Sequence, residues 1–390
     1  MKIAVVCDSF KGSLTSKDAC AAVKDGLLRC NKNFEVLSLP FADGGEGTSR
    51  CFYDILGGQL RKAAVHDPLL REITAEYTVL PDGTAVIDIA SASGLTLLKS
   101  SERDAVKVSS LGSGELICDA AEHGAKHIIL GLGGSATTDA GTGILYALGM
   151  RFFSEDGVEV LPDGQNMIRV KKIRRTENFE RFKDIKFTLA CDVTNPLCGE
   201  NGAAYVFSPQ KGASKNDVEL LDDGLRNIGE VFEKASGKKI INLPGAGAAG
   251  GIGGGLSAFL NCELQSGFDV LARAASLEDK IRRSDAVITG EGKTDRQTLF
   301  GKLPKRVSDI AEKFGVPCIL LSGDVENDIS AETLGVCEIY KIKENGISLE
   351  HCMKNAASLL SEKAFAIGKD SKIINKQYSR KQEKMRKNER

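Results

Sequence analysis

The sequence has no excess of charge of either sign, and this absence already excludes several kinds of partner. Its 52 Lys and Arg residues are balanced by 53 Asp and Glu residues, which leaves a formal net charge of −1 at pH 7. Such a balance gives no global electrostatic reason to bind nucleic acid or an anionic membrane surface. We therefore expect no nucleic acid and no membrane among the partners of this chain.

Long apolar runs are also missing. No stretch approaches the roughly 20 consecutive apolar residues that a membrane-spanning helix needs. Residues 1–6 read as a first β-strand rather than as a signal peptide. The sequence therefore predicts a cytoplasmic protein.

The cysteines lack any metal-binding spacing. Eleven are present, but they are scattered, and neither a C-x-x-C pair nor an H-E-x-x-H motif occurs. The odd count and the missing secretion signal favour reduced thiols in the cytoplasm over a disulfide framework.

The two ends of the chain share an alternating pattern of strands and helices. The length of 390 residues argues for two or three domains at ~150 residues each. Strands are predicted at residues 2–7 and 35–39, with a helix at 17–29 whose first turn Thr15 and Asp18 would cap. The last part alternates in the same way, and a single long helix is expected over 349–367. We predict an α/β fold in which residues 1–58 and 281–370 form one doubly wound parallel-sheet domain, flavodoxin-like or Rossmann-like.

The middle of the chain has a different pattern. Two β-rich runs, residues 73–79 and 84–90, are joined by the turn sequence Leu80-Pro81-Asp82-Gly83, which predicts a hairpin. Residues 59–280 are therefore expected to form a second, mixed-sheet α/β domain inserted into the first. Residues 371–390 are rich in Lys and Arg and are expected to be a disordered basic tail.

Glycine-rich loops are what the sequence has in abundance. Three occur, at residues 42–48, 131–139 and 290–295, each with hydroxyl or acidic residues. Glycine lets backbone N–H groups approach an anion closely, and a following helix start favours negative charge. Together the three loops indicate an enzyme that handles phosphate.

The second loop has the best context, because it follows an apolar strand and precedes a helix. It predicts nucleotide binding by Gly133, Gly134, Ser135 and Thr137. The loop also fits the dinucleotide pattern G-x-G-x-x-A, and a tight strand-to-helix turn with close packing is the competing interpretation. A further glycine run, residues 245–255, is either such a turn or a loop that shapes itself around substrate.

Other polar residues follow predicted strands, where ligands of doubly wound sheets collect. Asp8 and Lys11 follow the first strand and could contact a hydroxyl and an anion, and Asp43 follows the second. Glu291 and Asp295 at the third glycine loop are candidate metal ligands. The remaining candidate is Asp192, which also follows a predicted strand. An aspartate at this position could be the base that takes a proton from a substrate hydroxyl.

Several of these segments, in this order, make the chain similar to the type I glycerate kinases. The resemblance runs from about residue 1 to residue 368, and the segments that carry it are residues 8–14, 42–48, 131–143, 190–202, 209–213, 244–251 and 285–302. It implies a two-domain α/β fold and transfer of the γ-phosphoryl group of ATP to D-glycerate with Mg²⁺, giving a phosphoglycerate, with 2-phosphoglycerate favoured. The sequence departs from the family pattern at Cys7, at Thr294-Asp295-Arg296 and at residues 303–306. None of these departures removes a motif carboxylate.

Under this resemblance the candidate residues take roles. Asp192 is the base on the glycerate hydroxyl, and Lys11 stabilises the transferring phosphoryl group. Backbone N–H groups of Gly133, Gly134 and Ser135 contact the phosphates, and Glu291 and Asp295 hold the metal. The acceptor pocket is expected to be lined by Asp8, Ser9 and Asp43.

Two other functions remain open from the sequence. One is a nicotinamide-dependent dehydrogenase of a small hydroxy acid that uses the dinucleotide pattern, with Glu155 or Asp156 on the ribose. The other is a non-catalytic sensor of a nucleotide or sugar acid. A homodimer is a further expectation, which the sequence does not decide.

Overall fold

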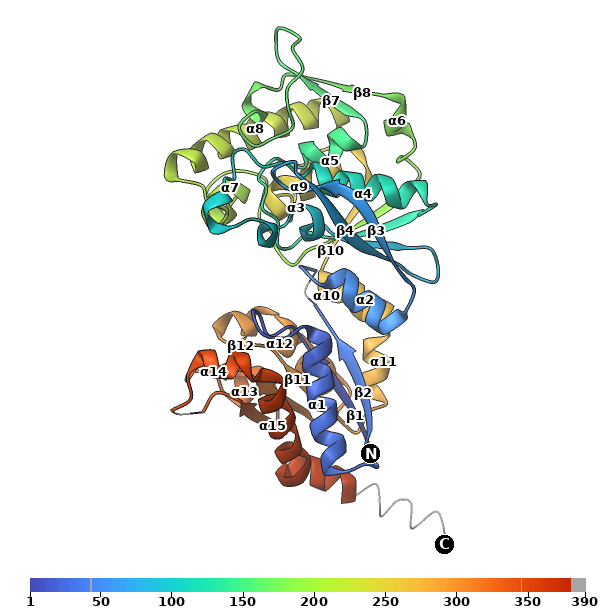
Figure 1. Cartoon of the computed structure of the whole chain (residues 1–390), viewed down its shortest axis with the longest axis vertical. Helices are drawn as coiled ribbons and strands as arrows, with labels where there is room; N and C mark the ends of the chain where they lie inside the picture. Colours follow the sequence, from blue (N-terminus) through green and yellow to red (C-terminus); the bar gives the residue numbers. More distant parts are fainter. Residues whose placement is uncertain (43, 345, 380–390) are drawn as a thin grey trace. The chain divides into compact units, whose positions relative to one another are not determined.

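The structure, a computed structural model, describes residues 1–42, 44–344 and 346–379. The chain divides into two compact units, of which the first comprises Met1–Asp43 and Leu271–Arg390 and the second Gly44–Val270 (Figure 1). The second unit is therefore an insertion between the two halves of the first. No helix in the described ranges combines the length and the apolar character that a bilayer crossing requires.

The first unit is built on a five-stranded parallel sheet with the order β2-β1-β11-β13-β15. Its strands are β1 (Lys2–Cys7), β2 (Glu35–Pro40), β11 (Ala286–Gly290), β13 (Cys318–Ser322) and β15 (Glu338–Lys341). This is the flavodoxin-like order, in which the direction of winding reverses between β1 and β11. The predicted doubly wound domain is confirmed.

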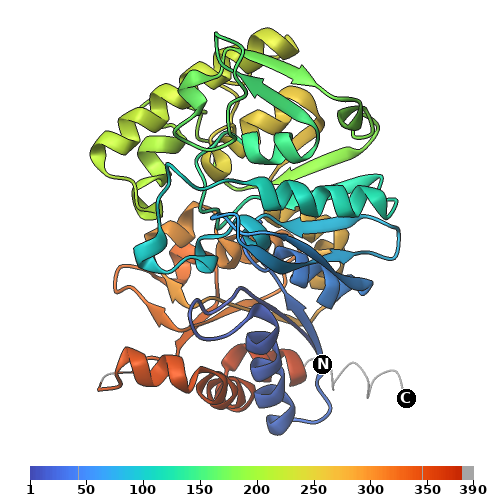
Figure 2. The same ribbon diagram turned by 45° about the horizontal axis from the view of Figure 1, so that its top comes forward.

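Helices cover both faces of this sheet. The main ones are α1 (Ser16–Cys30), α12 (Leu303–Lys313) and α15 (Ala356–Asp370). α1 and α15 lie side by side (Figure 2), and Leu27 and Leu360 from these helices share one buried cluster with Ile3 and Val5 of β1. α12 contacts β11 and β13. Right-handed crossovers on the two sides of the reversal place α12 on the face opposite α1.

Local sequence signals decide how these helices begin and end. Thr15 Oγ1 accepts a hydrogen bond of 3.1 Å from the N–H of Asp18, so the predicted cap of α1 is confirmed. The single helix expected over residues 349–367 is instead two, α14 (Leu349–Lys354) and α15. They separate at Asn355, whose side-chain amide donates to the carbonyl of His351 at 3.0 Å and so competes with the helical backbone.

The second unit contains a six-stranded mixed sheet with the order β10-β9-β6-β5-β4-β3. Its strands are β3 (Gln59–His66), β4 (Glu72–Val79), β5 (Ala85–Asp88), β6 (His127–Gly131), β9 (Lys186–Ala190) and β10 (Asn261–Gln265). β5, β6, β9 and β10 are parallel to one another, and β4 pairs antiparallel with both of its neighbours, β3 and β5. The predicted hairpin is therefore β4–β5 and the mixed sheet is confirmed, whereas β3 was not foreseen.

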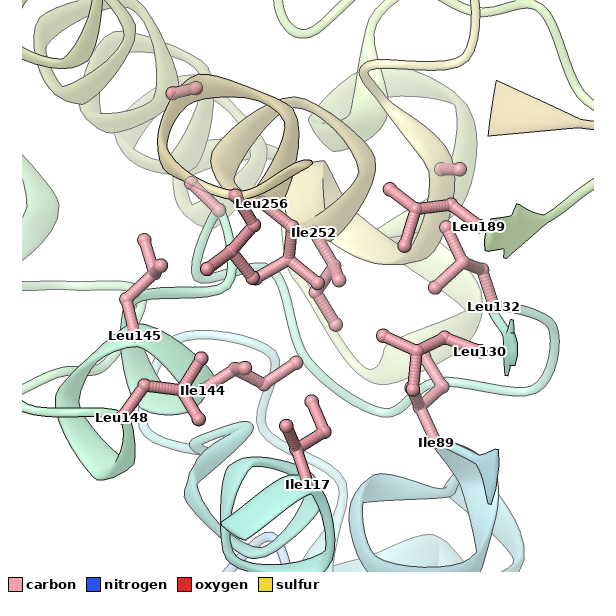
Figure 3. Close-up of a cluster of buried hydrophobic side chains, with 14 of the residues drawn as sticks. Ile89, Ile117, Leu130, Leu132, Ile144, Leu145, Leu148, Leu189, Ile252 and Leu256 are labelled. Carbon is pink, nitrogen blue, oxygen red and sulfur yellow. The ribbon is translucent and has the colours of Figure 1, made fainter. Parts of the chain in front are cut away.

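The core of the second unit lies between this sheet and three helices. These helices are α4 (Leu111–Glu122), α5 (Thr142–Ala147) and α9 (Ala248–Phe259). Figure 3 shows Leu130 of β6 and Leu189 of β9 facing Ile117, Ile144 and Leu256 of the helices, and all five are fully buried. Each such side chain contributes about 1.5–3 kcal/mol relative to exposure. This packing fixes the ends of β6 and β9, where the candidate residues lie.

Smaller elements complete the two units. Those of the first unit are α11 (Leu277–Arg282), β12 (Lys293–Thr294), β14 (Asp324–Val325) and α13 (Ala331–Leu334). Those at or within the second unit are α2 (Thr48–Leu56), α3 (Ala90–Ser93), β7 (Met150–Phe153), β8 (Lys172–Arg175), α6 (Glu177–Glu180), α7 (Ala203–Phe207), α8 (Lys215–Ser236) and α10 (Gly267–Ala274).

The boundaries of the insertion differ from those expected near residues 58 and 280. α2 belongs to the second unit because it contacts β4 and β5, and Ser49 Oγ donates to the carbonyl of Val86 at 2.9 Å. α11 belongs to the first unit, where it contacts α12. The expected boundaries fell just after α2 and within α11, because neither helix was predicted from the sequence.

The expected disordered tail is corrected for its first residues. Residues 372–379 are helical, Ile374 is fully buried in the cluster of α1 and α15, and Tyr378 packs edge-on against Phe34 at 5.9 Å between ring centroids. The apolar side chains of this segment recur at helical spacing, and this pattern outweighs the basic composition. The rest of the expected tail lies outside the described residues.

We predict that Ile374→Ala destabilises the first unit by about 2–5 kcal/mol, the usual loss for removing a buried isoleucine side chain. Thermal unfolding of the full chain measures it, with Lys376→Ala as the exposed control on the same helix. Equal melting temperatures for Ile374→Ala and the control would show that residues 372–379 do not dock in solution.

Candidate functional site

The candidate residues fall into two polar clusters, one in each unit, both at carboxyl ends of parallel strands. The strand-end cluster of the first unit comprises Asp8, Ser9, Lys11, Glu291 and Asp295. The glycine-loop cluster of the second unit comprises Gly133, Gly134, Ser135 and Thr137, which follow β6. Asp43 lies outside the described residues.

Asp8 and Lys11 follow β1 in a turn. The N–H of Asp8 donates to Gly290 O at 2.9 Å, and its carboxylate accepts from the N–H of Ser9 at 2.6 Å. Burial raises the pKa of Asp8, against the hydrogen bond of Ser9 and the positive charges of Lys11 and Lys302. Lys11 is exposed, so its ammonium is accessible to an anionic ligand.

Glu291 lies at the end of β11 and is buried. Its Oε1 accepts from Thr298 Oγ1 at 2.7 Å and from Thr294 Oγ1 at 3.1 Å. Burial raises the pKa of Glu291, and the charge of nearby Asp8 acts in the same direction. Asp8 and Glu291 are thus close enough to influence one another electrostatically.

Asp295 has two structural partners. Its Oδ1 accepts from the N–H of Gln297 at 2.9 Å, as a helix cap does, and from Lys302 Nζ at 3.3 Å. Although partial burial acts the other way, the hydrogen bond and charge of Lys302 lower the pKa of Asp295. Among the described residues, no set of three or more His, Cys, Asp or Glu side chains is arranged to hold a metal ion.

The glycine-loop cluster packs backbone to backbone against the loop of residues 44–47. The N–H of Gly133 donates to Gly44 O at 3.2 Å, and a Cβ on Gly133 would lie 2.4 Å from the Cα of Gly45. Close packing therefore explains Gly133. Gly134 is exposed with φ +79°, and in the described part of the chain the N–H groups of Gly134 and Ser135 have no acceptor. These two N–H groups are the ones that could contact a phosphate.

A buried lysine lies beneath this loop. Lys211 is 3% exposed, and its Nζ donates to Thr137 O at 2.6 Å and to Ser135 Oγ at 2.9 Å. Burial lowers the pKa of Lys211 to about 7, while the negative charge of Asp139 opposes this shift. Thr137 Oγ1 is buried as well and has no partner among the described residues.

Asp139 and Asp88 anchor the surrounding backbone. Asp139 is fully buried and accepts from Ser110 Oγ at 2.7 Å, from Ser110 N–H at 2.9 Å and from two further backbone N–H groups, so it joins the starts of α4 and α5. Asp88 ends β5 and accepts from the N–H groups of Gly47 and Ser49 at the start of α2. Burial raises the pKa of Asp88 to about 7, despite these hydrogen bonds.

Asp192 follows β9, the strand beside β6, and is exposed. The same edge holds it near the glycine loop, because Leu132 N–H donates to Ala190 O at 3.1 Å. The side chain of Asp192 is thus presented at the surface beside the loop of β6. This placement suits a group that exchanges a proton with a ligand.

The glycine run of residues 245–255 packs against the backbone that follows the glycine loop at this edge. Ala249, Gly250 and Gly251 adopt left-handed backbone conformations, and a Cβ on Gly250 would lie 2.0 Å from Thr137 O. The N–H of Ala140 donates to Gly250 O at 3.0 Å. Of the two interpretations left open by the sequence, close packing accounts for these contacts.

The structure does not place an acidic residue where the dehydrogenase alternative needs one to bind the ribose. Asp156 lies in a turn after β7, closed by a hydrogen bond from Gly157 N–H to Ser154 O. β7 pairs with β8 in a separate two-stranded sheet rather than beside β6. Neither Glu155 nor Asp156 therefore ends the strand next to the glycine loop, as dinucleotide binding requires.

Sequence reasoning missed three charged residues that lie beside these clusters, namely Lys211, Asp88 and Lys302. Lys211 falls within residues 209–213, a segment that carries the family resemblance, and this was its only signal. Asp88 ends a strand predicted to continue to residue 90, so its place at the strand end was hidden.

Comparison with known proteins gives a consistent result. The family model described as the glycerate kinase family matches residues 3–372. The chain is 38% identical to a glycerate kinase of Halalkalibacterium halodurans, over 93% of this chain and 96% of that protein. It is also 38% identical to a glycerate 2-kinase of Escherichia coli, over 91% and 94% of the two chains.

A solved structure described as a candidate glycerate kinase 2 from Salmonella typhimurium LT2 has the same fold. It superposes with a TM-score of 0.84 at 35% identity and covers 94% of this chain and 97% of its own. With the family model, the two relatives and this fold in agreement, the chain belongs to the glycerate kinase family.

Proposed function

We propose that this chain transfers the γ-phosphoryl group of ATP to D-glycerate and forms 2-phosphoglycerate and ADP. The observation that carries the proposal is the family match over residues 3–372, with relatives named glycerate kinase and glycerate 2-kinase along nearly their whole length. The glycine-loop cluster supports it independently, because at a strand end it presents two N–H groups that have no acceptor among the described residues.

In this proposal the glycine loop binds the phosphates of ATP. Gly134 and Ser135 offer N–H groups, and Ser135 and Thr137 offer hydroxyls. Gly133 shapes the loop through its contact with Gly45, since its own N–H is bonded to Gly44 O. Phosphoryl transfer depends mainly on such positioning and charge neutralisation.

Asp192 is the proposed general base. Its carboxylate takes the proton of the glycerate hydroxyl as the hydroxyl oxygen bonds to the γ-phosphorus, and the bond from that phosphorus to the β–γ bridging oxygen breaks. ADP leaves with the electron pair of that bond. Lys11 stabilises the negative charge on the transferring group, for which its exposed ammonium is suited.

Asp8 and Ser9 are proposed to bind glycerate. Glycerate carries two hydroxyls and a carboxylate. Its hydroxyls need hydrogen-bond acceptors, and its carboxylate needs a cation. Asp8 supplies an acceptor at the end of β1, and Lys11 and Lys302 supply positive charge around it. Asp43 completes this set as a proposal from the sequence alone.

Mg²⁺ is proposed to accompany ATP, where it neutralises phosphate charge. Among the described residues the carboxylate of Glu291 accepts hydrogen bonds at Oε1 and none at Oε2, and Asp295 is engaged by Lys302. Glu291 therefore fits a metal ion better than Asp295 does. Mg²⁺ at such sites is held by one or two carboxylates and the substrate phosphates, and it keeps several waters.

The proposal includes a cytoplasmic location. ATP is available there, and the eleven cysteines of the chain, none of which forms a disulfide, would stay reduced. A homodimer remains a prediction.

We expect ATP to be converted to ADP only when D-glycerate and Mg²⁺ are both present, since the acceptor hydroxyl completes the reaction. Coupled ADP detection measures the rate, and ³¹P NMR of the product distinguishes 2-phosphoglycerate from 3-phosphoglycerate. L-glycerate serves as the matched control substrate. The absence of glycerate-dependent ADP formation across several sugar acids would refute the kinase function.

Asp192→Asn should lower kcat by about 10²–10⁴, the usual contribution of a general base, with little change in the affinity for ATP. Asparagine keeps the shape of the side chain but cannot take the proton. Asp184→Asn is the control, because Asp184 is an exposed carboxylate that precedes the same strand at its other end. A near-native kcat in Asp192→Asn would transfer the role of base to another carboxylate.

Gly134→Val should weaken ATP binding by about tenfold or more and leave glycerate binding nearly unchanged. A β-branched side chain opposes the positive φ of Gly134, and its Cβ would lie 3.2 Å from that of Ala90. Calorimetry measures both affinities, with circular dichroism to check the fold. Gly157→Val introduces the same strain in an open turn and should leave ATP binding intact. Loss of glycerate binding alone would place the nucleotide elsewhere.

A further inference from the structure

Lys211 is a cationic side chain in a buried position, where apolar packing alone does not require a charge. It is 3% exposed at the end of a short 3-10 turn, Pro209–Lys211, that follows α7. A buried lysine loses hydration that only hydrogen bonds and opposite charge can replace. Two of its three N–H groups donate, to Ser135 Oγ and to Thr137 O.

No carboxylate pairs directly with this ammonium among the described residues. Asp139 is the charged group that acts on it, and the oxygens of Asp139 already accept from Ser110, Gly141 and Gly143. The positive charge of Lys211 is therefore only partly balanced within the second unit. An anion above the loop would complete the balance.

The hydrogen bonds around Lys211 also set the direction of a hydroxyl. Because Ser135 Oγ accepts from Lys211 Nζ, its own hydrogen must point to another acceptor. Phosphate oxygens accept only. The same loop holds three further groups without a partner in the described part of the chain, namely the N–H groups of Gly134 and Ser135 and the buried Thr137 Oγ1.

We infer that Lys211 is a positioning residue for the phosphates of ATP: it orients the Ser135 hydroxyl toward them, fixes the loop through Thr137 O, and supplies positive charge from beneath. This inference rests on the proposed kinase function and adds a residue to its nucleotide site. Lys211 lies 76 positions from Ser135 in the sequence, so the fold alone brings the two together.

The affinity for ATP should depend on pH through Lys211. A free-enzyme pKa of about 7 leaves Lys211 largely neutral at higher pH. Binding of the ATP phosphates favours the charged form, so the protein takes up a proton on binding. Affinity for ATP should therefore fall as pH rises above 7, by up to about tenfold per pH unit until the pKa of the complex is reached.

The test compares wild type, Lys211→Met and a matched control by calorimetry with ATP and Mg²⁺, without glycerate, between about pH 7.5 and pH 9. In this range the phosphates of ATP are fully ionised. The control is Lys238→Met, because Lys238 likewise donates two hydrogen bonds within this unit, in its case to the carbonyls of Ser257 and Leu260 at an exposed helix end. Buffers of different ionisation enthalpy report the proton uptake.

Lys211→Met should bind ATP at least about tenfold more weakly than wild type near pH 7.5, with a flat pH profile and no proton uptake from Lys211. In turnover, the KM for ATP should rise more than the KM for glycerate. Lys238→Met should follow the wild-type curve. Wild-type affinity in Lys211→Met would overturn the inference, and so would weakened binding whose pH profile parallels that of wild type.

If Lys211→Met does not fold, Ser135→Ala decides the question. This variant keeps Lys211 and its bond to Thr137 O, and removes the oriented hydroxyl together with the hydrogen bond that this hydroxyl accepts from Lys211. Several-fold weaker ATP binding at an unchanged melting temperature supports the inference, and unchanged affinity overturns it. A wild-type chain that binds no ATP would overturn the proposed function itself, whereas normal wild-type turnover with a normal Lys211→Met would overturn only the role of Lys211.

Discussion

The strand edge of the second unit that carries the candidate residues depends on backbone segments that touch without side chains between them. The loop after β6 lies directly on residues 44–47, and the glycine run that leads into and forms the first part of α9 lies directly on Thr137 and Ala140. A Cβ on Gly133, Gly250 or Gly255 would fall within 2.4 Å of a neighbouring backbone atom. Three segments far apart in sequence can therefore meet at one strand edge only because each has glycine at the point of contact.

Such packing leaves little side-chain volume, so polar groups must hold the segments in place. Asp139 joins the starts of α4 and α5, and Asp88 receives the start of α2. A buried donor left without its acceptor costs about 1–3 kcal/mol. These carboxylates satisfy N–H groups that the helices themselves leave free. The edge is thus rigid because buried charge and glycine packing act on the same loops.

The sequence predicted those features that local patterns determine. The strand at Lys2–Cys7, the Thr15 cap and the β4–β5 hairpin each follow from hydrophobic periodicity or turn residues within a few positions. It failed where tertiary contacts decide. β3 has mostly half-exposed residues and little apolar alternation, and the break at Asn355 needs a side-chain hydrogen bond that periodicity does not encode.

The candidate site shows the same division. Strand ends identify Asp8, Glu291 and Asp192, but no local signal separates a glycine that packs from one that faces a ligand. Gly133 and Gly134 are neighbours in one motif, yet the N–H of Gly133 donates to Gly44 O, whereas that of Gly134 has no acceptor in the part of the chain that the structure describes. The buried Lys211 favours the phosphate interpretation for the loop as a whole. Close packing alone would be served by a neutral side chain, and a buried ammonium beneath Ser135 is costly unless an anion is to bind above it. In the proposed nucleotide site the packing and phosphate interpretations of this loop are complementary, because the glycines that pack hold the proposed phosphate-binding groups in position.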